Sequence, residues 1–316
     1  MKMEEQNNFG WTDVLMLLTV LIWAVNFSLI KIALREFSPH GFNGIRLFSA
    51  SLILVLILWI SGQGLRLERR EILKIVGISI AGNTVYQILF IQGINQTTAS
   101  NASIILAMSP IFIALLSSSL KHEKIHWAGW LGILISFFGF YLVISKGTGN
   151  LHLSGKSLRG DLMIFLGNIC WATYTVLAKP LLEKVSPLKL TAITLTIGTL
   201  FYLPFAARDI SRLAWKEISL EAWTSLSYSS LLAIVASFTI WYASVKRVGN
   251  SKTSIYGNIT PVFAALFAYL FLSERITSFQ ILGALTIFIG FYLTRSGYRL
   301  FLKKEKYGRD KLKNLI

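Results

Sequence analysis

Cysteine and histidine are scarce in this sequence of 316 residues, and both scarcities limit the chemistry it can perform. Cys170 is the one cysteine, so an internal disulfide and a cysteine-based metal site are excluded. Of the four histidines, His122 and His126 lie four residues apart beside Glu123, but they fall in a short connection and we predict no metal site there. The GxxxxGK(S/T) phosphate-binding loop is also absent, which argues against ATP hydrolysis. We therefore expect no cofactor, no metal and no catalytic residue.

Charged residues are also few, at 15% of the chain against about 25% in soluble domains. The acidic residues closest to long apolar segments all lie near the segment ends: Asp13, Asp161, Glu123, Glu221 and Glu274. A buried carboxylate relay is the usual sign of proton coupling in a membrane protein, so the sequence gives no support for such coupling.

Apolar residues, by contrast, make up 54% of the chain, and the mean hydropathy is +0.59. They form blocks of the roughly 20 residues that a helix needs to cross a bilayer. We predict ten spans, near residues 13–34, 43–61, 72–93, 98–120, 127–145, 160–180, 188–207, 222–245, 250–272 and 278–295. The chain is thus predicted to be an all-α integral membrane protein. The net charge of +16 does not indicate nucleic acid as a partner, because the basic residues lie between and after the apolar blocks.

The sequence contains an internal repeat. Residues 23–39 match residues 171–187 at an offset of 148, and residues 97–143 match 248–294 at an offset of 151. The matched positions pair Trp23 with Trp171, Lys31 with Lys179, Pro39 with Pro187 and Pro110 with Pro261. We therefore divide the chain into a first repeat at 13–145, a second at 160–295 and a basic tail at 296–316.

Each repeat contains five spans, and because five is odd the second repeat must enter the membrane from the opposite side. The predicted fold is ten transmembrane helices arranged as two inverted five-helix repeats. Most of the 31 Lys and Arg residues fall on one side, which predicts cytoplasmic N- and C-termini. In this assignment Arg46 belongs to an outside segment, at the start of the second span. The tail 296–316 either contacts anionic membrane lipid or is a solvated orientation signal.

The repeated residues resemble the EamA family of the drug/metabolite transporter superfamily. The resemblance is carried by residues 23–27 with Lys31, and by Pro110 and Pro261, each followed by a closing glutamate. Glycine-rich spans end each repeat, at residues 139–142 and 290–293. One departure is that His122 and Ser273 stand where the family often has glycine before that glutamate.

The resemblance implies a ten-helix transporter with a central cavity, which moves small metabolites or amino acids, often outward. We therefore expect a secondary-type transporter in the cell membrane that exports a small polar solute by alternating access. The alternatives are a membrane-embedded enzyme and a non-transporting scaffold. An enzyme would need an Asp/Glu/His cluster at a membrane face.

Polar and aromatic residues within the spans are the candidate solute-binding residues, because polar groups there are costly unless partnered. Asn83 and Gln87 share a helix face beside Tyr86 and suit a zwitterionic or hydroxylated solute. Hydrogen bonding between helices is the alternative explanation of these positions. The full set of candidates is Trp23, Asn26, Asn83, Tyr86, Gln87, Asn101, Trp171, Tyr174, Ser237, Trp241, Ser254 and Asn258.

Prolines, lysines and glycines at repeated positions suggest further roles. Pro110 and Pro261 are expected to act as hinges, because proline removes a helix hydrogen bond. Lys31 and Lys179 either reach the membrane interface or attract an anionic group of the solute. The glycines of the fifth and tenth spans are expected to pack helices, with a homodimer contact as a further expectation.

Overall fold

The computed structural model describes residues 10–64, 68–120, 127–145 and 156–293, and this part of the chain is helical with no strand. The predicted tail 296–316 and Glu123 lie outside the described residues. Eight of the described helical segments are long and apolar enough to cross a membrane. Two shorter apolar helices, Thr260–Leu272 and Ser278–Leu293, belong to the last two spans, which gives the ten spans predicted from the sequence.

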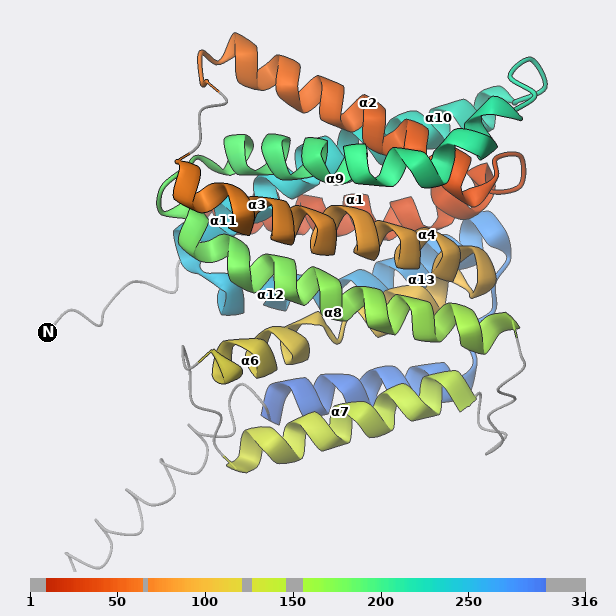
Figure 1. Ribbon diagram of the computed structural model, residues 1–316. Helices are drawn as coiled ribbons and strands as arrows, with labels where there is room; N and C mark the ends of the chain where they lie inside the picture. Colours follow the sequence, from red (N-terminus) through yellow and green to blue (C-terminus); the bar gives the residue numbers. More distant parts are fainter. Residues whose placement is uncertain (1–9, 65–67, 121–126, 146–155, 294–316) are drawn as a thin grey trace, which may run out of the picture.

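The first repeat begins with two unbroken helices and ends with a third, while its two middle spans are interrupted (Figure 1). The third span passes from α-helix to π-helix and back, and the fourth is divided into two short helices. In chain order the elements are α1 Trp11–Ala33, α2 Pro39–Ile60, α3 Arg69–Ser79, η1 Ile80–Val85, α4 Tyr86–Gln96, α5 Ala99–Leu106, α6 Ser109–Ser119 and α7 Trp127–Ser145.

The second repeat has the same pattern of unbroken and interrupted spans. Its elements are α8 Lys156–Leu182, α9 Pro187–Ser211, α10 Leu220–Tyr228, η2 Ser229–Ala236, α11 Ser237–Val248, α12 Asn250–Gly257, α13 Thr260–Leu272 and the helix Ser278–Leu293. The two π-helical segments occupy corresponding positions, and so do the two breaks. The internal symmetry of the sequence therefore extends to the irregular parts of the helices.

Proline fixes where the second span of each repeat starts. Pro39 and Pro187 each stand in the first turn of their helix, preceded by a serine in extended conformation. Proline suits this position because the first turn needs no amide donor. The hydroxyl of Ser186 also accepts a hydrogen bond from the Lys189 amide at 3.1 Å. The second span accordingly begins at Pro39 rather than near residue 43, which places Arg46 inside the helix.

Equivalent helices of the two repeats run antiparallel, which confirms that the repeats are inverted. In the α2–α9 pair, Gly44 lies against Ala206, while further along α2 the hydroxyl of Ser51 is 2.8 Å from that of Thr199. The residue number rises along one helix as it falls along the other. α7 and the helix Ser278–Leu293 are related in the same way and lie side by side at one edge of the bundle (Figure 1).

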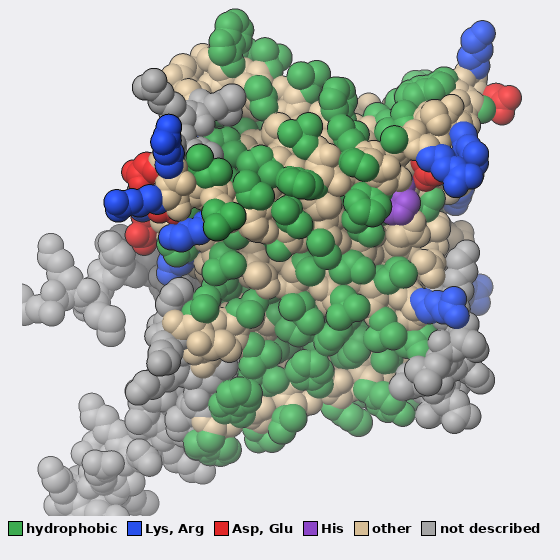
Figure 2. All heavy atoms as spheres, viewed as in Figure 1, with side chains coloured by type: hydrophobic (Ala, Val, Ile, Leu, Met, Phe, Trp, Pro, Cys, Tyr) green, Lys and Arg blue, Asp and Glu red, His purple; other side chains and the backbone are tan. Residues whose placement is uncertain are grey.

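The surface has the polarity expected of a membrane protein. Figure 2 shows hydrophobic side chains over the middle of the molecule, with Lys and Arg gathered at the two ends of the helices. Large apolar residues such as Leu52, Leu134 and Val262 are more than half exposed on three different helices. Exposure of this kind along whole helices is stable in hydrocarbon and costly in water, so these faces are lipid-facing.

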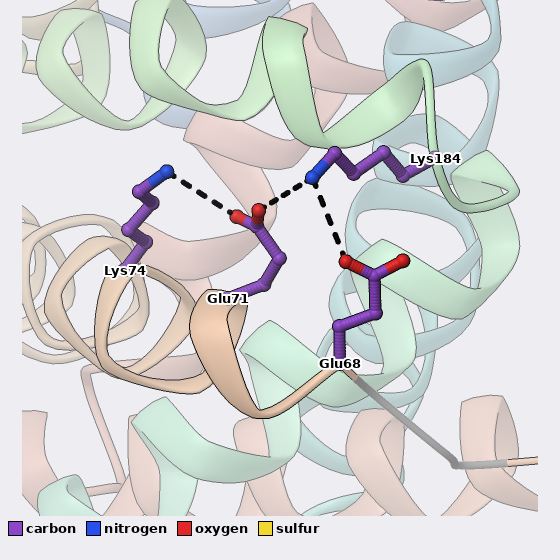
Figure 3. A network of polar contacts seen from close by, with 4 residues as sticks. All are labelled: Glu68, Glu71, Lys74 and Lys184. Carbon is purple, nitrogen blue, oxygen red and sulfur yellow. Dashed lines mark hydrogen bonds and ion pairs between the residues drawn. The ribbon is translucent and has the colours of Figure 1, made fainter.

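Ion pairs join the connections at one end of the bundle (Figure 3). The Lys184 ammonium lies 2.6 Å from Glu71 and 3.7 Å from Glu68, and Lys74 lies 3.6 Å from Glu71. The hydrogen bond to Glu71 raises the pKa of Lys184 above its ordinary value. This cluster ties the connection between α8 and α9 to the start of α3.

At the opposite end, a carboxylate joins the two repeats. Glu36 accepts hydrogen bonds from the Ser219 amide at 2.6 Å and the Ser219 hydroxyl at 2.7 Å. These bonds favour the ionised form and lower the pKa of Glu36. The connection after α1 is thereby held at the start of α10.

Candidate functional site

A cavity of about 90 Å³ lies near the centre of the bundle, between the two repeats. Its walls come from α1, α2 and α4, from both halves of the two broken spans, and from α8, η2 and α11. All six spans that hold the candidate solute-binding residues contribute, and the second span joins them through Arg46.

Aromatic rings form much of the wall. The repeat-related Trp23 and Trp171 meet edge to face, with ring centroids 6.3 Å apart. Trp241 lies 5.2 Å from Trp23, and Phe238 lies 5.1 Å from Trp171. The indole of Trp23 also donates to the Ala233 carbonyl at 2.9 Å. These tryptophans therefore pack the helices together and also line the cavity.

Several polar groups in the wall have no hydrogen-bond partner among the described residues. Gln87 is fully buried, and neither its amide nitrogen nor its amide oxygen makes a hydrogen bond to a described residue. The side-chain amide oxygen of Asn26 and the indole nitrogen of Trp241 are also buried without a partner among the described residues. An unmet buried polar group costs about 1–3 kcal/mol, so these groups mark positions at which a solute could bind.

Arg46 lies in the cavity wall and was not among the candidates from the sequence. It lines the cavity, only 3% of its surface is exposed, and its Nε and Nη1 have no hydrogen-bond partner in the described part of the chain. The sequence reasoning placed it in an outside segment because the second span was started too late. Pro39 was the missed signal: seven residues into a helix correspond to about 10 Å of depth.

Seven of the twelve candidate solute-binding residues line the cavity, and so does the hinge candidate Pro110. The seven are Trp23, Asn26, Tyr86, Gln87, Trp171, Trp241 and Ser254. Lining residues that were not among the candidates include Phe27, Phe90, Phe238, Ser103, Ser109 and Thr260. The three phenylalanines give no signal in a membrane sequence, because most of the chain is apolar.

The other five candidates lie away from the cavity wall. Asn83 packs against Gly198 of α9, and the Tyr174 hydroxyl is 2.6 Å from the Thr194 hydroxyl. Asn101 donates to Asp161 at 3.2 Å and accepts from Gln280 at 2.6 Å. Ser237 and Asn258 are buried elsewhere in the helix bundle. As solute ligands, all twelve remain predictions.

Asn83 and Gln87 do not both line the cavity. Asn83 lies within η1, whereas Gln87 is the second residue of α4. Asn83 packs against Gly198 of α9, whereas Gln87 lines the cavity.

At the proline positions the α-helix is interrupted by a turn of two residues, 107–108 in the fourth span and 258–259 in the ninth. α5 ends at Leu106 and α6 begins at Ser109, with Pro110 in its first turn. Pro261 occupies the same position in α13, after the break that follows α12. Carbonyls freed at the first break are bonded: the Asn168 amide donates to Ile105 at 2.9 Å. The hydroxyl of Ser109 donates to the Leu106 carbonyl at 2.6 Å.

The two repeat-related lysines differ in their surroundings. The Lys31 ammonium donates to the backbone carbonyls of Ile94 and Thr97, at 3.2 and 2.8 Å, and so ties α1 to the connection before α5. Lys179 is exposed near the end of α8. Neither lysine is part of the cavity wall. Their role as charge partners of the solute remains a prediction.

Two acidic side chains accept hydrogen bonds from residues at the start of α5. Glu274 accepts from the amides of Ala99 and Ser100, at 3.0 and 3.2 Å, at the positive end of the α5 helix. Buried Asp161 accepts from Thr97 and Asn101, which lie on either side of the same helix start. Glu274 belongs to the segment that carries the family resemblance, and here it acts as a helix cap.

Within the described residues, no group of three or more His, Cys, Asp and Glu side chains is placed to hold a metal ion. The thiol of Cys170 is partly buried and unpaired in that same part of the chain. Among the described residues, the cavity wall therefore offers a solute aromatic rings, side-chain amides and one arginine.

Comparison with known proteins gives the same picture. The EamA-like transporter family matches residues 10–145 and, a second time, residues 158–296. An uncharacterized transporter of Archaeoglobus fulgidus is 32% identical over 289 residues, covering 90% of this chain and 96% of its own. The uncharacterized transporter YyaM of Bacillus subtilis is 28% identical over 276 residues, covering 86% of this chain and 88% of its own.

A solved crystal structure superposes with a TM-score of 0.67, covering 92% of this chain and 98% of the other, at 14% sequence identity. At that identity the likeness supports the fold alone. The double family match confirms the resemblance seen in the repeated residues, and the names of the relatives point to transport. The chain therefore belongs to the EamA-like transporter family and is a multi-pass membrane transporter.

Proposed function

We propose that this transporter is of the secondary type and moves a small polar metabolite or amino acid by alternating access of its two inverted repeats. The observation that carries the proposal is the central cavity, whose wall combines aromatic rings with unpartnered polar groups from both repeats. A pocket that is mostly apolar with a few converging polar groups is typical of a small-molecule site.

The broken spans supply the moving parts of this proposal. Pro110, Ser109 and Thr260 lie beside the cavity and directly after the breaks in the two spans. A change of angle at either break would move one half-helix without breaking a continuous helical hydrogen-bond ladder. Pro110 and Pro261 are accordingly proposed as hinge residues, and because the repeats are inverted the two hinges control opposite sides of the membrane.

We further propose that the protein lies in the cell membrane with both termini in the cytoplasm and that net transport is outward. The excess of Lys and Arg in the segments assigned to the inside supports the orientation. The outward direction rests on the family resemblance. Membrane lipid, including anionic lipid at the tail, is the proposed partner besides the solute.

Flux measurements on purified protein in liposomes test this function. Liposomes with and without the protein are loaded with a labelled panel of amino acids, organic acids, sugars and nucleosides. We expect at least one solute to leave at a rate that saturates with its concentration. Equal rates with and without protein across the whole panel would contradict the proposal.

A further inference from the structure

We propose that the solute is a small organic anion whose negatively charged group binds Arg46 and whose apolar body lies against the aromatic wall. This inference rests on the proposed transport function and specifies the solute class of the same cavity. It excludes amines as favoured solutes, and it ranks an amino acid below a carboxylate of the same size.

The burial of Arg46 is the first argument. Its guanidinium is enclosed among helices and reaches the cavity, and no carboxylate of a described residue lies within the 4 Å of an ion pair. A buried cation is costly unless it is paired. Its Nε and Nη1 donors have no partner among the described residues, and the planar guanidinium binds carboxylates better than the ammonium of lysine does.

The position of Arg46 is built by its neighbours. Its Cζ lies 5.8 Å from the centroid of the Phe90 ring, in a cation–π contact. Its backbone carbonyl accepts from the hydroxyls of Ser49 and Ser230, at 3.1 and 3.3 Å, which joins α2 to η2. Phe90 lines the same cavity, so the guanidinium lies at the cavity wall, and the backbone that carries it is bonded to the second repeat.

The charge of the wall is the second argument. Among the described residues that line the cavity, Arg46 carries the one full charge; the others are aromatic, aliphatic, amide or hydroxyl side chains. An ammonium group entering this site would lose its hydration shell beside a like charge, without a carboxylate to replace the water. An anion would gain a partner for its charge.

The size and shape of the cavity give the third argument. A volume of about 90 Å³ accommodates roughly six to nine water-sized groups, since each needs about 10–15 Å³. The rings of Trp23, Trp171, Trp241 and Phe238 offer flat apolar faces to the part of the solute that is not charged. Benzoate combines an aromatic ring and a carboxylate at that size, so it is a suitable probe.

The test compares ligands that share one ring but differ in charge. Binding of benzoate, benzamide, benzylamine and phenylalanine to the purified full-length protein is followed through quenching of tryptophan fluorescence, since three tryptophans line the cavity. Benzoate is expected to bind about 10- to 100-fold more tightly than benzamide or benzylamine, as a charge-assisted hydrogen bond predicts. Tighter binding of benzylamine or phenylalanine, or no binding of benzoate, would overturn the proposal.

Variants assign the effect to the arginine. Arg46→Gln should lose the same 10- to 100-fold in benzoate affinity, while Arg46→Lys, which keeps the charge but not the planar fork, should lose less. Arg35→Gln, an exposed arginine near the same membrane face, is the matched control and should bind as the native protein does. Unchanged benzoate affinity in Arg46→Gln would overturn the proposal. If that variant fails to fold, Arg46→Lys and the ligand series decide the outcome.

The same variants in liposomes separate this inference from the proposed function. If phenylalanine flux is unaffected by Arg46→Gln, the transport function is supported and the proposal of an anionic solute is overturned. If benzoate binding depends on Arg46 but no solute shows flux, the anion-binding site is supported and the transport function is contradicted.

Discussion

At the scale of single residues, Gln87 combines complete burial with two unmet hydrogen-bonding groups. Such a residue lowers the stability of the protein, because its amide was desolvated on folding and gained no protein partner in return. A residue that is costly for folding and points into a cavity is more easily explained by solute binding than by packing.

The substitution Gln87→Leu should therefore raise stability while it lowers transport. Removing the unmet amide should increase the free energy of unfolding by about 1 kcal/mol. The loss of solute contacts should reduce flux. Thermal unfolding in detergent and flux from liposomes measure the two effects on the same preparation.

Gln92→Leu is the matched control, one and a half turns further along α4. The Gln92 amide is bonded to His40 at 2.8 Å, so its removal should lower stability instead. If Gln87→Leu leaves the flux unchanged, Gln87 does not belong to the solute site.

Sequence reasoning at this scale was most successful for polar and aromatic residues near mid-span, such as Trp23 and Gln87. It was wrong about the surroundings of Arg46, because its depth depends on where the helix begins. It expected Asn83 at the cavity beside Gln87, whereas Asn83 lies within η1 and packs against α9.

At the scale of helices, the irregular segments could be predicted only in part. The sequence located Pro110 and Pro261, but a proline alone does not tell whether the helix bends there or is interrupted. Nothing in the sequence indicated η1 or η2, since apolar spans have too little contrast between faces to reveal a change of helical period. The breaks and η2 nevertheless contribute residues to the cavity wall, and irregular helical segments are frequent at functional sites.

The contact between α7 and the helix Ser278–Leu293 gives a prediction at this scale. A methyl group added at Gly283 would lie 2.6 Å from Val143 Cγ2 and 2.8 Å from the Gly139 carbonyl oxygen. Gly283→Ala should therefore force the helices apart and lower the free energy of unfolding by about 1–3 kcal/mol. Thermal unfolding in detergent measures the change.

Gly77→Ala is its control, because a methyl group there meets no atom within 4 Å. Alanine is the better helix former, so this variant should be as stable as the native protein or more so. Equal stability of both variants would contradict the close contact. The glycines of these spans pack within one chain, and the homodimer contact remains a prediction.

At the scale of the whole molecule, the inverted architecture followed from counting spans. The inference needed only the parity of the crossings in each repeat, which does not depend on exact boundaries. The antiparallel contact of α2 with α9 confirms it. The sidedness of the membrane is a separate question that the helices alone do not answer.

Single cysteines test that sidedness. In a Cys170→Ala background, Ser61→Cys and Arg212→Cys place exposed thiols at opposite ends of the bundle. Arg212→Cys should react with a membrane-impermeant maleimide on intact cells, and Ser61→Cys only after lysis. The reverse pattern would invert the proposed orientation, whereas reaction of both on intact cells would contradict the ten-span arrangement.

The inverted repeat also has an energetic consequence. If both halves had the same sequence, the inward-open and outward-open states would be related by a simple rotation and would have equal free energy. Only unmatched pairs between the halves can then set the resting equilibrium. Arg46 belongs to such an unmatched pair. At the repeat offset of 148 its equivalent is Thr194, a neutral residue whose hydroxyl is hydrogen-bonded to that of Tyr174. The residue proposed to bind the solute is therefore also one that makes the free energies of the inward-open and outward-open states differ.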